Sequence, residues 1–130
     1  MKKTDVSRLV KQWTPLLIDH YGLQNWAVMV SVGESDKFKG VCEATFKYME
    51  ARIYVSYNQA NSKEDLWETL CHEFEHILTS PFKDAWLIAE GLLNEEQANI
   101  VEEVFALADE YCRSLLGVLR KNKKVLKMPP

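Results

Sequence analysis

Residues 62–80 read SKEDLWETLCHEFEHILTS, and this stretch predicts the central helix of the fold. Ser62 is a plausible N-cap, and the acidic residues just after it suit the first turn of a helix. On that helix His72 and His76 lie about 40° apart on neighbouring turns, so both imidazole rings can reach one metal ion. Glu73 lies about 100° from His72, and its carboxylate can accept a proton from metal-bound water.

The apolar side chains of this helix gather in one arc of the helical wheel, which should face the core. His72, Glu73 and His76 lie in the adjoining arc, at the edge of the apolar stripe. Such an edge is typical of residues that line a cleft. The apolar arc consists of Leu66, Trp67, Leu70, Cys71, Phe74, Ile77 and Leu78.

The segment before this helix predicts a second helix and a small sheet. Apolar residues recur at helical spacing from residue 6 to residue 22, and Pro15 predicts a kink or a restart within that helix. Short apolar and β-branched segments then predict three strands, of which the last two form a hairpin. The strands are expected at 26–32, 41–48 and 52–57.

The segment after the motif predicts one more helix. Pro81 should end the motif helix near residues 79–80, and the periodic stretch 94–116 predicts a C-terminal helix that carries glutamates. The expected fold class is α+β, with an N-terminal helix, a three-stranded sheet, the motif helix and this last helix. We expect a single domain over 1–118 and a basic tail over 119–130.

The composition restricts the kinds of partner. With 130 residues, of which 47% are hydrophobic, the chain can bury a core without cross-links. A net charge of −3 gives no reason to expect nucleic-acid binding. No apolar run is long enough for a bilayer and the first residues do not form a secretory signal, so we expect a cytoplasmic protein without membrane association. Cys42, Cys71 and Cys112 lack CxxC spacing, which predicts free thiols.

Two histidines make half of a tetrahedral zinc site, so a third protein ligand is needed. The segment NEEQAN, residues 94–99, resembles the NExxSD segment of the gluzincins, the thermolysin-like branch of the zinc peptidases. In that family a glutamate on a second helix completes the Zn²⁺ site. The resemblance implies Glu95 as the third ligand. It also places Asn99 where the family has an aspartate that accepts a hydrogen bond from a ligand histidine.

The helical wheel of the last helix leaves other ligands open. Its apolar residues centre well away from Glu95, and Glu96 lies nearer the edge of that stripe. The wheel therefore favours Glu96, whereas the motif favours Glu95. Glu90 and Glu102 are further alternatives.

The order of helix, short sheet, HExxH helix and glutamate helix resembles small zincin-like proteins, including the ImmA/IrrE-type peptidases of phage and mobile elements. Glu75 stands where that family often has the glycine of HExGH. The resemblance implies a zinc metallopeptidase that acts on a peptide or protein substrate, with Glu73 as general base. An oxyanion-stabilising residue is also implied, for which Tyr111, Tyr57 and His20 are candidates.

Peptide substrates of such enzymes commonly pair with a sheet edge beside the metal, and the strand expected at 41–48 is the candidate edge. Two other functions are open. The chain could be a zincin-derived regulatory or interaction module that binds metal without efficient catalysis. It could also be a structural helical domain with an accidental motif, which predicts no stoichiometric metal.

Overall fold

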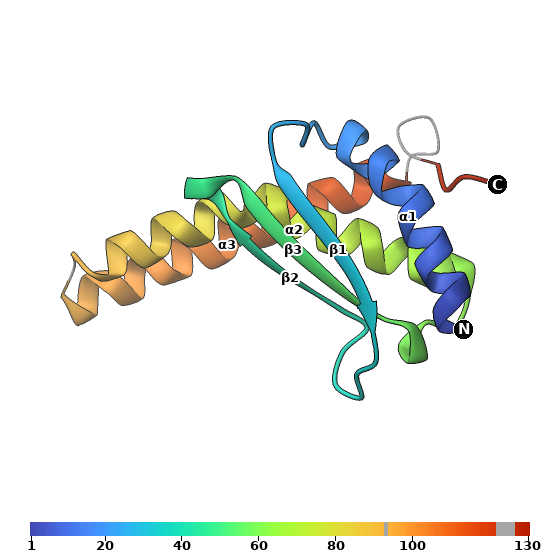
Figure 1. Cartoon of the computed structure of the whole chain (residues 1–130). Helices are drawn as coiled ribbons and strands as arrows, with labels where there is room; N and C mark the ends of the chain where they lie inside the picture. The colour runs from blue at the N-terminus through green and yellow to red at the C-terminus, as the bar shows by residue number, and fades with distance from the viewer. Residues whose placement is uncertain (93, 122–126) are drawn as a thin grey trace.

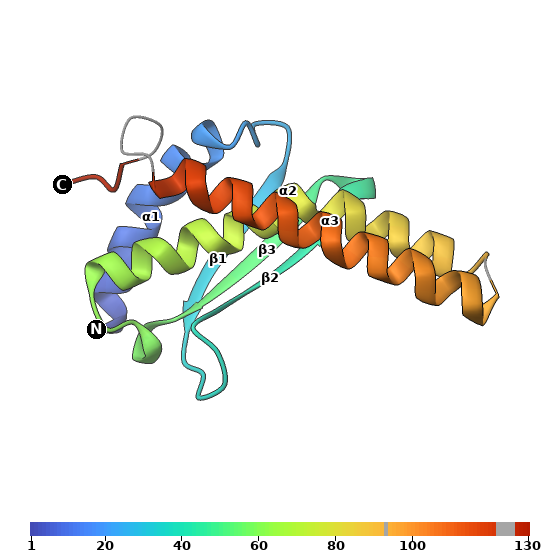
Figure 2. The same ribbon diagram turned by 180° about the vertical axis from the view of Figure 1, so that it is seen from behind.

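The computed structural model of the chain describes residues 1–92, 94–121 and 127–130, with side chains except at 90, 105, 113 and 115–121. It confirms the expected α+β class. α1 and α2 cover one face of a three-stranded sheet, and α3 packs along α2 (Figures 1 and 2). The elements are α1 (Lys3–His20), β1 (Ala27–Gly33), β2 (Gly40–Thr45), β3 (Glu50–Ser56), α2 (Lys63–Glu90) and α3 (Glu95–Lys121), with short 3₁₀ turns at Phe46–Tyr48 and Tyr57–Gln59.

The strand order is β1-β3-β2, so the last strand in the sequence is the central one. β2 and β3 pair antiparallel, which confirms the expected hairpin, and β1 pairs parallel to β3. β2 ends at Thr45, earlier than expected, because Phe46–Tyr48 form a 3₁₀ turn that leads to Met49 in the left-handed region, with φ 51°. β2 is therefore an edge strand, and it lies beside α2.

The core lies between the sheet and the helices. Trp13 of α1 is fully buried and meets the Trp67 ring edge-on at 5.2 Å between centroids. Ile53 of the central strand and Phe74 of α2 are buried beside them. Phe74 belongs to the apolar arc that flanks the motif on α2, so packing of this arc fixes the rotation of the helix and hence the direction of the motif side chains.

Ser62 caps α2 as expected, since its Oγ accepts a hydrogen bond from the Asp65 backbone N–H at 3.1 Å. The Asp65 carboxylate accepts from the Asn61 N–H at 3.0 Å and from Lys39 Nζ at 2.7 Å. The bond from Asn61, followed by that from Lys39, lowers the pKa of Asp65 below its ordinary 3.8. The start of the motif helix is thereby tied to the segment just before β2.

We expect Asp65→Asn to lower the free energy of unfolding at pH 7 by roughly 0.5–1 kcal/mol, a small loss because both partners are partly exposed to solvent. A carboxyl whose pKa is lowered on folding stabilises the fold above its unfolded pKa and loses this effect as the pH falls through the folded value. The difference between wild type and variant should therefore shrink below about pH 4. Urea unfolding at pH 7 and pH 3 measures it, and a difference that stays constant would contradict the assignment.

Both prolines that were expected to disturb helices lie inside them. α1 continues through Pro15 without a restart, and α2 continues through Pro81 to Glu90. The expected helix end near residues 79–80 is therefore wrong. Pro81 lacks the N–H that would bond to the Ile77 carbonyl, and Ser80 Oγ donates to that carbonyl at 2.7 Å instead. The hydroxyl satisfies the acceptor that the proline leaves open, so the helix can go on.

α2 and α3 form a long antiparallel hairpin that projects beyond the sheet (Figure 1). The apolar residues of α3 divide between two sides: Val101, Ala108 and Cys112 are half-buried, whereas Ile100, Val104, Leu107 and Tyr111 are exposed.

The chain beyond the hairpin departs from the expected tail. α3 ends at Lys121, past the expected domain boundary at 118, and part of the expected tail, residues 122–126, lies outside the described residues. Met128, within the same expected tail, packs against the core. Among the described helices, none combines the length and the apolar character needed to cross a membrane.

Candidate metal centre

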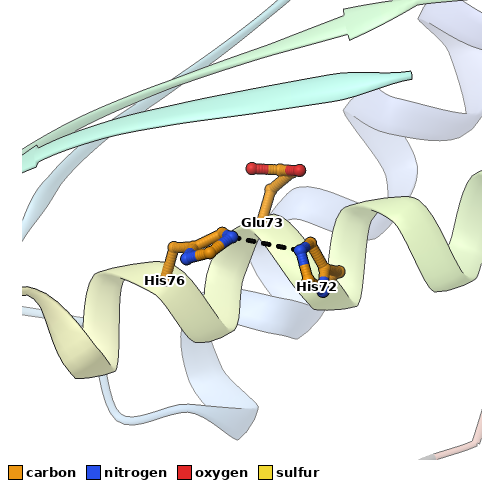
Figure 3. Close-up of side chains that lie close together, drawn as sticks. All are labelled: His72, Glu73 and His76. Atoms are coloured by element: carbon orange, nitrogen blue, oxygen red, sulfur yellow. Dashed lines mark hydrogen bonds between the residues drawn. The ribbon is translucent and has the colours of Figure 1, made fainter. Parts of the chain in front are cut away.

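The two motif histidines lie close enough to bind one ion. His72 Nε2 and His76 Nε2 are 3.1 Å apart, and the two rings stand nearly perpendicular at 88° (Figure 3). A tetrahedral zinc ion with nitrogens at about 2.0–2.1 Å holds two of them roughly 3.3 Å apart. The spacing of the histidine pair is within a few tenths of an ångström of that requirement, and it is also of hydrogen-bond length, so the two rings could hold one metal ion between them.

Glu73 joins this pair. One ligand atom from each of His72, Glu73 and His76 lies within 4.8 Å of the others, a potential metal-binding group among the described residues. The Glu73 carboxylate lies on the side of the histidine pair that faces the strands (Figure 3). Glu73 is buried, with 5% of its surface exposed, whereas His76 is half-buried and His72 is exposed. The Glu73 carboxylate thus lies in the buried part of the site, whereas the imidazole rings of His72 and His76 lie nearer the solvent.

A cavity of about 510 Å³ opens over this group. β2 and the stretch of α2 from His72 to Trp86 line this cavity, and α3 contributes two acidic residues and an alanine. The lining residues are Gly40, Val41, Cys42 and Ala44 of β2; His72, Glu73, His76, Thr79, Ser80, Phe82, Lys83 and Trp86 of α2; and Glu102, Ala106 and Asp109 of α3.

The structure does not bring Glu95 to the histidines. Because α2 continues through Pro81, the 14 residues that follow His76 in the helix span about 21 Å before the hairpin turns. Glu95 begins α3 just after that turn. In the described part of the chain Glu95 and Glu96 are both exposed, and neither lines the cavity. The side chain of Glu90, another alternative, lies outside the described residues.

The acidic residues of α3 that line the cavity are Glu102 and Asp109. α2 ends 14 residues after His76 and α3 begins 14 residues before Asp109, so the two residues are equally far along the chain from the hairpin turn. Asp109 is half-buried, whereas Glu102 is exposed and one heptad nearer the turn. Glu102 was an outside alternative from the sequence, and Asp109 was missed. A count of residues from the turn matches Asp109 with His76. That count needs the end of α2 at Glu90, which the sequence did not predict.

Two further side chains in the cavity were not expected from the sequence. Burial is the larger cause and the negative charge of Glu73 the second of a rise in the pKa of the Cys42 thiol to about 12. The positive charge of Lys83 acts in the opposite direction. Cys42 is therefore a neutral thiol at physiological pH. Lys83 brings a positive charge to the same cavity.

The residues expected to stabilise an oxyanion do not line this cavity. Among the described lining residues there is neither Tyr111, Tyr57 nor His20.

We expect metal-free protein to show very slow alkylation of Cys42. A thiol with the ordinary pKa of 9.0 is about one-tenth thiolate at pH 8, whereas a pKa of about 12 leaves roughly one part in 10⁴. Iodoacetamide labelling, followed by peptide mass spectrometry, should give a rate at least about 100-fold below that of a short cysteine peptide. The rate should still be rising at pH 10. Labelling of Cys42 as fast as the peptide would show that the thiol is not held in a buried, acidic setting.

Comparison with known proteins gives no relative: no family model matches the chain, and neither a curated protein nor a solved structure matches it. What the structure supports is the cluster of His72, Glu73 and His76, which could hold a metal ion.

Proposed function

We propose that the cleft between β2 and α2 binds one zinc ion and hydrolyses peptide bonds. The observation that carries this proposal is the pair of imidazole nitrogens 3.1 Å apart, with a buried carboxylate beside them and an open cavity of about 510 Å³ above.

His72 and His76 would hold the ion, and we propose Asp109 as the third protein ligand. Asp109 is as many residues from the hairpin turn as His76 is, lines the same cavity and is half-buried; its carboxylate is not in the group formed by His72, Glu73 and His76, so it would have to move toward the ion. Two imidazoles and one carboxylate form a donor set that suits catalytic zinc and leaves a position open. Glu102 is the alternative from the same helix. Glu95, which the gluzincin resemblance implies, is tested beside them.

Glu73 would act as the general base. When bound, zinc lowers the pKa of a coordinated water and polarises a carbonyl. Glu73 takes the proton of the attacking water and delivers it to the departing amine nitrogen. Its carboxylate is suited to this because it lies at the wall of the site, within 4.8 Å of both histidines. Lys83 lines the same cavity, and its positive charge would balance negative charge that develops on the carbonyl oxygen.

The proposed substrate is an extended segment of polypeptide. β2 is an edge strand, and its residues line the cavity, so a peptide can pair with its free edge. A second cavity of about 300 Å³ adjoins the first and is lined by Asp65, Thr69 and Glu73, among others. From Asp65 to Trp86 the two cavities follow α2 for about 31 Å, the length of roughly nine extended residues.

One observation favours a second function. Because Glu73 lies within 4.8 Å of both histidines, its carboxylate could itself be the third ligand. A site of that kind would have no free base, and the protein would be a metal-binding regulatory or interaction module. The two functions differ in what the Glu73 side chain does, and substitution of this residue separates them.

The direct test of the peptidase is an unbiased peptide mixture incubated with the zinc-loaded protein and analysed by mass spectrometry. Cleavage that disappears with a chelator and returns with added zinc is expected. Zinc-loaded protein that leaves every peptide intact would contradict the proposal.

A further inference from the structure

Gly40, the first residue of β2, lies in direct contact with Glu73. A Cβ built on Gly40 would stand 3.0 Å from Glu73 Cγ, 3.2 Å from Glu73 Oε1 and 3.0 Å from Thr69 Cγ2. The backbone does not require glycine at this position, because among the described glycines the positive φ belongs to Gly22. The absence of a side chain at Gly40 therefore serves the space around Glu73 and not the course of the chain.

Neither neighbour can easily give way. Cγ of Glu73 is only one bond from the Cβ that α2 fixes, so it cannot move as the far end of a long side chain can. Thr69 Oγ1 donates to the Asp65 carbonyl at 2.8 Å, which holds the rotamer that points Cγ2 toward Gly40. A methyl group at residue 40 would have to shift the strand or turn the Glu73 side chain.

Gly40 also lies where the two cavities meet. Gly40, His72 and Glu73 line both the larger and the smaller cavity. A peptide that extends along β2 from one cavity to the other must pass this point, where glycine leaves the strand backbone uncovered.

We propose that Gly40 is a positioning residue, because its missing side chain leaves the space in which the Glu73 side chain lies against β2 and beside the histidine pair. The catalytic part of this inference rests on the proposed function. A side chain at residue 40 would displace the base without touching His72 or His76, so it would slow the chemical step and leave zinc binding in place.

A double-mutant cycle tests the contact without any need for activity. Gly40→Ala, Glu73→Ala and the double variant are compared with wild type by thermal unfolding of the metal-free protein. Gly40→Ala is expected to lower the unfolding midpoint of the wild-type protein by about 4 °C or more. In protein that already carries Glu73→Ala, the same substitution should lower the midpoint by much less. The loss that remains in the double variant should come from Thr69 Cγ2. Adding Thr69→Ser, which removes Cγ2 and keeps the hydroxyl, should relieve part of that loss. Equal losses in all backgrounds would overturn the proposal.

Gly91→Ala is the matched control, since a Cβ at Gly91 meets open space apart from the Ile88 carbonyl oxygen at 3.6 Å. It should show no coupling to Glu73. If Gly40→Ala alone does not fold, recovery of folding beside Glu73→Ala supports the contact, and failure of the double variant as well overturns it.

The kinetic arm uses the zinc-loaded protein. Gly40→Ala is expected to keep its zinc and to lose at least about tenfold in kcat, with a smaller change in KM. An unchanged kcat would overturn the positioning role. If the wild type cleaves no peptide, the proposed function fails, and the unfolding cycle still decides whether Glu73 needs the space that Gly40 leaves.

Discussion

Protein purified without added metal is expected to carry close to one zinc ion per chain, and His76→Ala is expected to lose it. Removing His76 leaves one imidazole of a pair whose nitrogens are 3.1 Å apart. Loss of a hydrogen-bonded partner of a metal ligand already costs about 10–100-fold in affinity, and loss of the ligand itself should cost more. Elemental mass spectrometry of the purified proteins measures this. A wild type that takes up no zinc even after incubation with it would contradict the metal site.

The same measurement on isosteric variants identifies the third ligand. Asp109→Asn is expected to lose zinc, whereas Glu95→Gln and Glu96→Gln should keep it, because those two lie at the far end of the hairpin. Glu102→Gln separates the two acidic residues of α3 that line the cavity. Loss of zinc with Glu95→Gln alone would instead support the ligand that the gluzincin resemblance implies, and would require α3 to lie differently against α2.

Glu73→Gln is expected to keep zinc and to lose peptide hydrolysis by about 10²–10⁴-fold, the range for removal of a general acid–base group. Glutamine has nearly the same shape as glutamate, but at neutral pH its amide cannot accept the proton of the attacking water. Zinc content and the rate of peptide cleavage are measured on the same preparation.

Glu43→Gln is a control for the loss of one negative charge, because this residue is exposed on β2 and does not line either described cavity. Zinc and activity should both be unchanged in this variant. If Glu73→Gln loses zinc, the carboxylate is a ligand and the metal-binding module is the better description. If it keeps both zinc and activity, Glu73 is not the base.

Local sequence patterns predicted most of the elements. Short apolar and β-branched segments predicted the strands, and the N-cap Ser62 with its acidic first turn predicted where α2 begins. The HExxH spacing predicted that His72 and His76 lie on one face, because the helical repeat alone brings residues four apart onto adjacent turns. These features depend on neighbours within a few residues, so they can be read without knowledge of the rest of the chain.

Sequence patterns did not predict where the hairpin turns. Proline ends many helices, yet α2 continues through Pro81, and there the Ser80 hydroxyl bonds to the Ile77 carbonyl that the proline leaves without its usual donor. The longer α2 moves the turn outward, so Glu95 lies away from the histidines and Asp109 is as many residues from the turn as His76 is. The NExxSD-like segment alone therefore pointed to a residue that the structure leaves at the far end of the hairpin.

By itself, the sequence determined the helix, the two histidines and the acid between them, since these follow from the repeat of an α-helix. Only the tertiary structure decided what surrounds them. The strand order β1-β3-β2 places the edge strand over the motif, and the length of α2 selects which carboxylates of α3 face it. Such contacts join residues far apart in the chain, and they depend on packing geometry that no local pattern contains.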